Sequence, residues 1–276
     1  MKQIIFLPFS LLLFISCQQE NLQSISRESL LKELQETKAD AGLLILLKDK
    51  EIAVKVNLIQ ENGMYKEGNE EVFHQPRNTG TLLTTIPLMC ILDSISPTDT
   101  VDVGNGIYIK DGKEIRDHNA DRGGYGVLTT EQVLAFDSKI GFIKLMEKNE
   151  QTLEANFYKM GFSTLELSPL EIVNFYNRIA HKDTSLCSPK VMEDIQNMLS
   201  KVITNGTGKN LYREDIPIAG KTGNAENEVS CCAYFTLDNS VYTCLVIISN
   251  PKKGYPSGGM MAGNVINGIV NQLKEK

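Results

Sequence analysis

The tripeptide Lys221-Thr222-Gly223 is the part of this sequence whose residue types and order most directly suggest chemistry. On a strand at the edge of a sheet, the lysine would supply positive charge, the threonine hydroxyl would bind a substrate carboxylate, and the glycine would let the substrate approach the backbone. Acyl-transfer sites use these features. The backbone N–H of Asn224, the next residue, would help to stabilise an oxyanion. A tripeptide of common residues often arises by chance, so the surrounding sequence decides how strongly it indicates an acyl-transfer site.

The surroundings of this tripeptide follow an order that resembles a known family. A Gly-rich segment at residues 205–208 precedes it, and an apolar strand, a Gly-Gly pair at residues 258–259 and a terminal helix follow it. Together with motifs earlier in the chain, this order resembles the transpeptidase domain of class B penicillin-binding proteins, particularly the division type. The earlier motifs are residues 99–106, 115–119, 124–126, 167–171 and 174–177. The resemblance extends from Ala41 to the C-terminus.

The resemblance implies a fold, a chemistry and a class of partner. The fold would be an α+β domain of the serine β-lactamase and D,D-peptidase superfamily, with helices flanking an antiparallel sheet of about five strands. Family members attack the D-Ala-D-Ala carbonyl of peptidoglycan stem peptides, and we expect neither a cofactor nor a metal ion. Substrate binding would fall to residues 221–224. The family carries several tens of residues more between Lys148 and Phe157, so we expect a shortened domain with a more open groove.

The catalytic residues depart from the family pattern. The family's Ser-x-x-Lys motif supplies a nucleophile and, three residues later on the same helical face, the lysine that takes its proton. Thr81 and Thr84 stand at those positions here, and an alternative register through Pro76 gives Asn78 and Thr81. Neither register contains a lysine, because none occurs between residues 67 and 109.

The second family motif, Ser-x-Asn, is also replaced, since Asp137, Ser138 and Lys139 stand where it should be. Loss of a nucleophile or of its base lowers the rate by about 10⁴ to 10⁶ in well-studied triads. We therefore interpret Thr81, Thr84, Asp137 and Lys139 as vestigial positions and predict a pseudoenzyme.

Three functions remain open at this stage. The first is a non-catalytic module that binds stem peptides or a cell-wall synthesis enzyme, with the charges of Lys139 and Lys221 holding a carboxylate beside Asp137. The second is a residually active, penicillin-binding D,D-transpeptidase whose unusual base is Lys139 or Lys221. The third is a lipoprotein scaffold with an inert cleft. We favour the first.

The first sixteen residues resemble a bacterial lipoprotein signal peptide. Met1-Lys2 is a positive start, and the apolar stretch at residues 4–15 is too short to span a bilayer, which needs about 20 residues. Ser16-Cys17 at its end resembles a lipobox, in which the chain is cut before the cysteine and the cysteine is then acylated. The alternative is a plain signal peptide cut nearby, with Cys17 an ordinary thiol.

This interpretation predicts a lipidated tether at residues 17–27 and one transpeptidase-like domain at residues 28–276. The protein would be a cell-envelope lipoprotein on the periplasmic side, held to a membrane by its lipid. Gln18-Gln19-Glu20 lacks the aspartate that retains some lipoproteins in the inner membrane, which favours the outer membrane. We expect the remaining cysteines to be small buried hydrophobes rather than a disulfide framework. They are Cys90, Cys187, Cys231, Cys232 and Cys244.

The composition is that of a globular domain. The chain has 276 residues, of which 42% are hydrophobic, so it can bury a substantial core. Its formal net charge is −6, which argues against non-specific nucleic-acid binding, because that needs a basic face.

Hydrophobic periodicity predicts the elements that must position these residues. Ser168, Pro169 and Glu171 have the spacing of a capped helix start, and that helix should continue to about Ala180. Other helices are predicted over residues 28–37, 82–92, 130–147, 189–205 and 263–273. Strands are predicted over residues 41–47, 51–59, 107–109, 216–222, 231–237 and 241–249.

Overall fold

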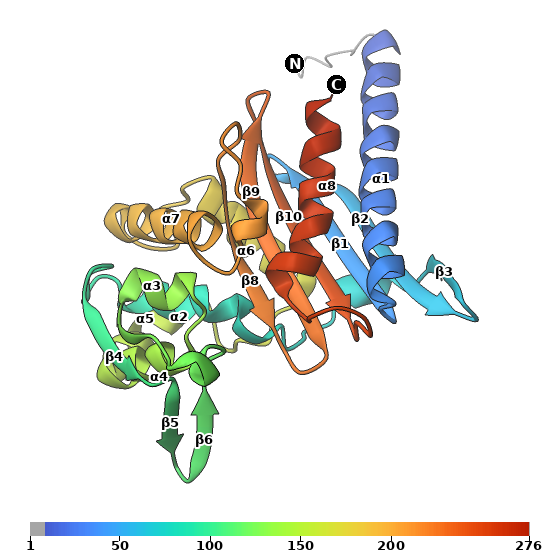
Figure 1. The fold of residues 1–276 in the computed structure, drawn as a ribbon. Coiled ribbons are helices and arrows are strands. Elements are labelled where there is room, and N and C mark those ends of the chain that lie inside the picture. Colours follow the sequence, from blue (N-terminus) through green and yellow to red (C-terminus); the bar gives the residue numbers. More distant parts are fainter. Residues whose placement is uncertain (1–8, 276) are drawn as a thin grey trace, which may run out of the picture.

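The computed structural model describes residues 9–275, and a six-stranded antiparallel sheet lies at its centre (Figure 1). Strands from the two ends of the sequence meet in this sheet, because β1 pairs with β10 along its whole length, from Ala41 opposite Ser249 to Lys48 opposite Tyr242. The strands, in sheet order, are β3 (Met64–Glu67), β2 (Glu51–Glu61), β1 (Ala41–Lys48), β10 (Ser240–Ser249), β9 (Glu228–Leu237) and β8 (Ile218–Asn224). The predicted α+β class is confirmed, and β3 makes the sheet one strand larger than expected.

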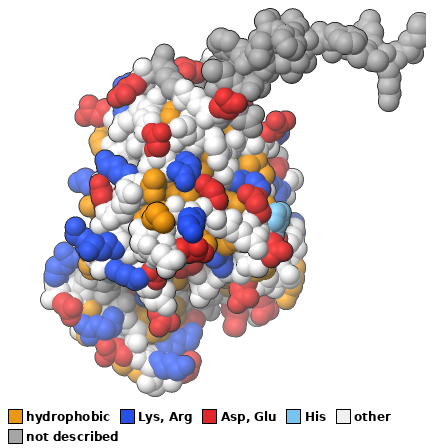
Figure 2. Space-filling view, turned by 90° about the vertical axis from the view of Figure 1, so that its right-hand side faces the viewer, with side chains coloured by type: hydrophobic (Ala, Val, Ile, Leu, Met, Phe, Trp, Pro, Cys, Tyr) orange, Lys and Arg blue, Asp and Glu red, His pale blue; other side chains and the backbone are white. Residues whose placement is uncertain are grey.

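Two helices cover one face of the sheet. α1 (Phe9–Thr37) and α8 (Gly263–Lys274) pack side by side in front of the strands (Figure 1). Leu30 and Leu34 of α1 are fully buried, and a Cβ on Gly42 of β1 would lie only 2.7 Å from Leu34 Cδ2. The close approach of helix and strand therefore requires glycine at that position. On the side of the molecule that carries α1 and β3, acidic and basic side chains are intermixed (Figure 2).

α1 begins much earlier than the helix predicted to start at residue 28. Leu22 and Ile25, which lie in the segment predicted to be a tether, are buried at 7% and 5% exposure. Their i, i+3 spacing continues the apolar stripe of the helix, so the segment from residue 22 onward is packed rather than free. Residues 1–8 of the predicted signal peptide and the Cys17 side chain lie outside the described residues. Within the described part, no helix is long and apolar enough to cross a membrane.

Helices α6 (Pro169–Ala180) and α7 (Pro189–Thr204) cover the opposite face of the sheet, with α7 beside β8. The predicted start of α6 is confirmed. Ser168 Oγ accepts the Glu171 N–H, and the Glu171 carboxylate accepts the Ser168 N–H at 2.8 Å. The Ser168 hydroxyl also donates to this carboxylate at 2.7 Å, and the hydrogen bonds from the Ser168 hydroxyl and N–H lower the pKa of Glu171. The capping box therefore fixes where α6 begins and which face it buries.

The middle of the chain forms a lobe beside the sheet, at the lower left of Figure 1. Its first helical part, predicted as one helix over residues 82–92, is divided into the 3-10 helix η2 (Gly80–Thr84) and α2 (Thr85–Ile91). The rest of the lobe consists of β4 (Thr100–Gly104), β5 (Ile107–Lys110), β6 (Lys113–Arg116), η3 (Ala120–Arg122), β7 (Gly126–Thr129), α3 (Thr130–Ala135), α4 (Lys139–Lys148) and α5 (Glu150–Lys159).

The single helix predicted over residues 130–147 is wrong, because the chain breaks it into α3 and α4. Asp137 takes a left-handed conformation with φ +56°, which ends α3. Ser138 then caps α4 by accepting the Gly141 N–H at 3.0 Å. The break places Asp137 in a tight corner between two helices. α4 and α5 are separated by Asn149 alone, in the segment predicted to be shorter than in the family.

The remaining short helices connect these layers. They are η1 (Glu70–Phe73), η4 (Lys209–Leu211) and the π-helical turn η5 (Gly258–Ala262), which leads into α8. The cysteines other than Cys17 are free thiols, and Cys90, Cys231, Cys232 and Cys244 are buried. Burial raises the pKa of the Cys231 thiol to about 12, so these buried cysteines act as small hydrophobes.

Candidate active site

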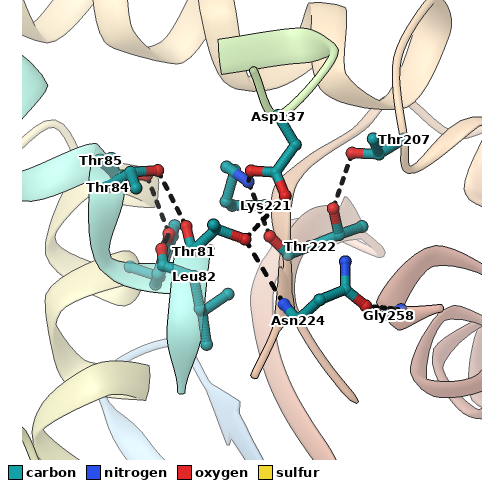
Figure 3. Close-up of polar contacts among 11 residues, drawn as sticks. Thr81, Leu82, Thr84, Thr85, Asp137, Thr207, Lys221, Thr222, Asn224 and Gly258 are labelled. Atoms are coloured by element: carbon teal, nitrogen blue, oxygen red, sulfur yellow. Dashed lines mark hydrogen bonds and ion pairs between the residues drawn. The ribbon is translucent and has the colours of Figure 1, made fainter. Parts of the chain in front are cut away.

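Thr81 lies where the helical lobe meets the edge of the sheet. Its Oγ1 donates a hydrogen bond to Asp137 Oδ2 at 2.7 Å and accepts the Asn224 N–H at 3.4 Å (Figure 3). The preceding residue, Gly80, has φ +61°, and a Cβ there would lie 2.0 Å from the Asn224 carbonyl oxygen. η2 is therefore pressed directly against β8, and the hydroxyl points into the junction.

Lys221 is fully buried and reaches the same carboxylate from the sheet. Its Nζ donates to Asp137 Oδ1 at 2.5 Å and to the Thr222 carbonyl oxygen at 2.7 Å. The Asp137 side chain is only 11% exposed, so the two charges compensate each other away from water. Both partners of Nζ are acceptors, so the nitrogen acts as a donor in each contact, and among the described residues no hydrogen bond joins it to the Thr81 hydroxyl.

The rest of the predicted substrate-binding segment is largely closed. Thr222 is fully buried, and its Oγ1 lies 2.6 Å from Thr207 Oγ1. A Cβ on Gly223 would lie 2.6 Å from Leu82 Cβ, so η2 covers this residue directly. Asn224 is exposed, and its Oδ1 accepts the Gly258 N–H at 3.1 Å. Within residues 221–224, Asn224 alone presents its side chain to solvent.

Thr84 is the residue that one of the two predicted registers places at the family's lysine position. Its Oγ1 donates to the Thr81 carbonyl oxygen at 2.8 Å, which closes a turn within η2. Tyr176, from α6, supports the same turn by donating to the Leu82 carbonyl oxygen at 2.6 Å and contacting Thr85 Oγ1 at 2.9 Å. Burial raises the pKa of Tyr176 well above its ordinary value, so the phenol acts as a neutral support.

Asp117 holds the corner that carries Asp137. Its carboxylate accepts hydrogen bonds from Ser138 Oγ at 2.7 Å and from the Ile140 N–H at 3.2 Å, and it is buried. Asp117 lies in residues 115–119, one of the motifs that resemble the family, but no role was predicted for it. This motif is the sequence feature from which its role could have been predicted.

An aromatic pair lies beside the same corner. Tyr125 stacks on Phe136 with ring centroids 5.2 Å apart, and its hydroxyl lies 2.7 Å from His118 Nε2. Partial burial raises the pKa of Tyr125 to about 12, so its hydroxyl stays protonated at neutral pH.

Lys139 does not join Thr81. It is an exposed residue at the first position of α4, and within the described residues its ammonium has no hydrogen-bond or ion-pair partner. It lines a pocket of about 210 Å³ that also includes Thr81, Thr84 and Asp137. The structure thus brings three of the four positions predicted to be vestigial together and places the fourth in the lining of the same pocket.

Part of the chain is similar in sequence to known transpeptidases. Residues 146–271 match the family described as the penicillin binding protein transpeptidase domain. A segment of 102 residues is 30% identical to a peptidoglycan D,D-transpeptidase FtsI homolog from Mesostigma viride. This match includes 33% of the chain and 17% of that relative, so the chain spans about a sixth of the relative's length.

Solved structures share the fold over nearly the whole chain. The transpeptidase domain of penicillin-binding protein 3 from Burkholderia pseudomallei matches with TM-score 0.73 and 18% identity, over 93% of this chain and 94% of that one. Apo penicillin-binding protein 3 from Mycobacterium tuberculosis matches with TM-score 0.75 and 15% identity, over 92% and 77%. The chain has the transpeptidase-domain fold of penicillin-binding proteins, which confirms the resemblance predicted from its motifs.

The buried ion pair leads to a prediction about stability. Asp137→Asn leaves the Lys221 ammonium buried without a countercharge, and we expect the free energy of unfolding to fall by about 3–5 kcal/mol in urea titrations. The double variant Asp137→Asn/Lys221→Met removes both charges and should recover most of the loss. Asp194→Asn, which breaks the exposed pair with Lys190, is the matched control and should change little. If the Asp137 and Asp194 variants lose equal stability, Asp137 does not hold the buried lysine.

Proposed function

We propose that this chain is a catalytically silent, transpeptidase-like domain of the cell envelope that recognises peptidoglycan stem peptides without forming an acyl-enzyme. The observation that carries this proposal is the Thr81 hydroxyl bound at 2.7 Å to the Asp137 carboxylate, with no hydrogen bond from that hydroxyl to a lysine among the described residues. The transpeptidase fold supports the link to peptidoglycan, and the altered catalytic positions support the absence of acylation.

The weakness of the replacement base supports catalytic silence. Removal of the proton from a hydroxyl needs a base that is free to accept it. Asp137 also forms an ion pair with the Lys221 ammonium, so the ammonium and the Thr81 hydroxyl share one carboxylate. With both family motifs replaced, we expect acylation to be slower by about 10⁴ to 10⁶ than in an intact enzyme.

Peptide recognition would use the exposed end of β8. β8 is the last strand of the sheet, but η2 covers Gly223 directly, so a peptide would reach only the exposed Asn224 at the end of the strand. Asp137 compensates the positive charge that was expected from Lys221. Binding of a peptide's terminal carboxylate would therefore depend on the exposed Asn224 and on neighbouring groups. A cell-wall synthesis enzyme that presents such a peptide is the alternative partner.

Labelling with a fluorescent penicillin tests the absence of acylation. The purified protein should give no band that survives denaturation, because no base removes the Thr81 proton. An intact penicillin-binding protein labelled in parallel is the positive control. A stable band that disappears in Thr81→Ala would overturn the proposal.

Binding of a soluble tripeptide ending in D-Ala-D-Ala, with its amino groups acetylated, tests the recognition. Asn224→Asp places a negative charge where the carboxylate would lie, and we expect the affinity measured by calorimetry to fall about tenfold or more. Asn239→Asp, the same change at the exposed β9–β10 turn, is the matched control and should bind normally. No binding to the original protein would favour a scaffold with an inert cleft.

Residual activity is the second candidate function, and one contact favours it. The hydrogen bond from Thr81 to Asp137 has the geometry of a nucleophile paired with a general base. The bases considered from the sequence, Lys139 and Lys221, do not contact the hydroxyl in the described structure, so Asp137 would take this role. The penicillin experiment distinguishes this candidate from the silent domain.

We further propose that Cys17 carries a lipid and that the protein is anchored to the outer membrane on its periplasmic side. The signal-like residues 1–16 support this proposal. Metabolic labelling with a palmitate analogue should mark the original protein and lose its signal in Cys17→Ala. Cys187→Ala, which removes a partly exposed thiol, should keep the label. Equal labelling of Cys17→Ala would contradict lipidation, and recovery of labelled protein in inner-membrane fractions would contradict the outer-membrane assignment.

A further inference from the structure

The start of α1 is fixed to the body of the molecule close to Cys17. Leu22 and Ile25 are buried, and the Gln23 side-chain amide donates to the Lys55 carbonyl oxygen of β2 at 3.2 Å. Cys17 lies on the same helix, five residues before Leu22. Five residues span about 8 Å as a helix and at most about 18 Å when fully extended. A lipid on Cys17 would therefore have only a short tether.

The candidate site lies at the opposite end of the sheet from the start of α1 (Figure 1). α1 leads into β1, whose first residue, Ala41, lies opposite Ser249 of β10. Ser249 in turn lies opposite Glu228 of β9, and Glu228 begins β9 directly after the turn that follows Asn224. The end of α1 and Asn224 are therefore at one end of the sheet. From Cys17 to its last residue, α1 rises by about 30 Å.

Two other elements end level with the start of α1. Asn264, near the start of α8, donates to the Glu33 carboxylate at 3.2 Å. Further along α8, a Cβ on Gly268 would lie 3.1 Å from Ser29 Oγ, so the two helices are antiparallel and α8 ends beside the start of α1. The turn between β9 and β10, with Asn239 exposed at its tip, lies at the same end of the molecule (Figure 1). We call the surface formed by the start of α1, the end of α8 and this turn the anchor end.

We propose that the membrane carrying the Cys17 lipid lies against the anchor end, so that Thr81 and Asn224 face away from it at a distance of about 30 Å. The proposal rests on the proposed lipidation and deepens the proposed function. An inverted molecule, with Asn224 at the membrane, would need a tether of about 30 Å, but at most about 18 Å of chain is available before Leu22.

This orientation favours one class of substrate. A peptide carried by a lipid in the same bilayer would have to extend about 30 Å from the membrane to reach Asn224. Stem peptides on the polymer outside the membrane approach from the other side and meet no such requirement. The anchor end thereby directs the site toward polymer-borne peptides.

Fluorescence quenching on vesicles tests the orientation. A fluorophore is placed at one end of β9 or the other, in Glu226→Cys at the β8–β9 turn or in Asn239→Cys at the β9–β10 turn, and both positions are exposed. Cys187→Ser removes the partly exposed native thiol. The lipidated protein is bound to phosphatidylcholine vesicles that carry a nitroxide on the lipid headgroup. Because β9 has 10 residues and is about 33 Å long, we expect about tenfold more quenching at Asn239 than at Glu226.

A third label reports whether the molecule lies on its side. Met64 belongs to β3, on the side of the molecule that carries α1, and it is 61% exposed. A label in Met64→Cys should be quenched less than the label at Asn239. Each labelled protein without a lipid, made from residues 17–276 with Cys17→Ser, is the control for quenching that does not depend on anchoring.

Variants of α1 test whether the short tether sets the orientation. Leu22→Asp/Ile25→Asp frees the start of the helix, so the chain from Cys17 to the next buried leucine, Leu30, can extend about 45 Å. The difference in quenching between the two ends of β9 should then fall several-fold. Gln23→Asp/Ser24→Asp, which places the same charges at exposed positions of the same helix, is the matched control and should retain the difference.

Three results on vesicle-bound protein would overturn the proposed orientation. They are equal or stronger quenching at Glu226 than at Asn239, the strongest quenching at Met64, and no quenching at any of the three labels.

Failure of the orientation is distinguishable from failure of the proposals on which it rests. A hexahistidine tag in place of residues 1–16, with Cys17→Ser and nickel-chelating lipid, gives the same measurement when Cys17 carries no lipid. Palmitate labelling reads lipidation separately. None of the quenching measurements reads acylation or peptide binding, so an overturned orientation leaves the silent-domain proposal standing.

Discussion

The buried Lys221–Asp137 ion pair is the interaction on which the candidate site depends. A lysine with no exposed surface at the edge of a sheet must have a countercharge within reach, because desolvating an isolated ammonium costs several kcal/mol. Asp137 provides it from the corner between α3 and α4, where its backbone is left-handed. Asp117 in turn fixes that corner through Ser138 and Ile140. The pair therefore joins the helical lobe to the sheet.

The same carboxylate determines the chemistry of the site. One Asp137 oxygen binds the Lys221 ammonium and the other binds the Thr81 hydroxyl, so the residue holds both groups in a closed arrangement. In an active acyl-transfer site the nucleophile would face a base able to take its proton. Here it faces a charge-compensated carboxylate, and a mostly apolar pocket lies beside it. This arrangement supports the proposed binding role.

Local signals in the sequence predicted much of the frame around this site. The Ser168 capping box placed the start of α6, and alternating or continuous apolar runs placed five of the six central strands. Two predictions failed for a shared reason. The apolar pattern of residues 130–147 continues across Asp137, and Leu22 and Ile25 stand among polar residues, so their helical spacing is a weak signal in the sequence. In both places contacts with distant segments decide the structure, and periodicity within a short window does not report such contacts.

The sequence by itself determined that no lysine occurs between residues 67 and 109, where the family's catalytic lysine was expected, and it predicted that Lys221 and Thr222 end one strand, directly before Gly223. Only the tertiary structure decided which group compensates Lys221, since Asp137 lies 84 residues away along the chain. Charge compensation in a buried site depends on distance in space. The packing of the helical lobe against the edge of the sheet therefore decides that the Thr81 hydroxyl contacts Asp137 rather than Lys139 or solvent.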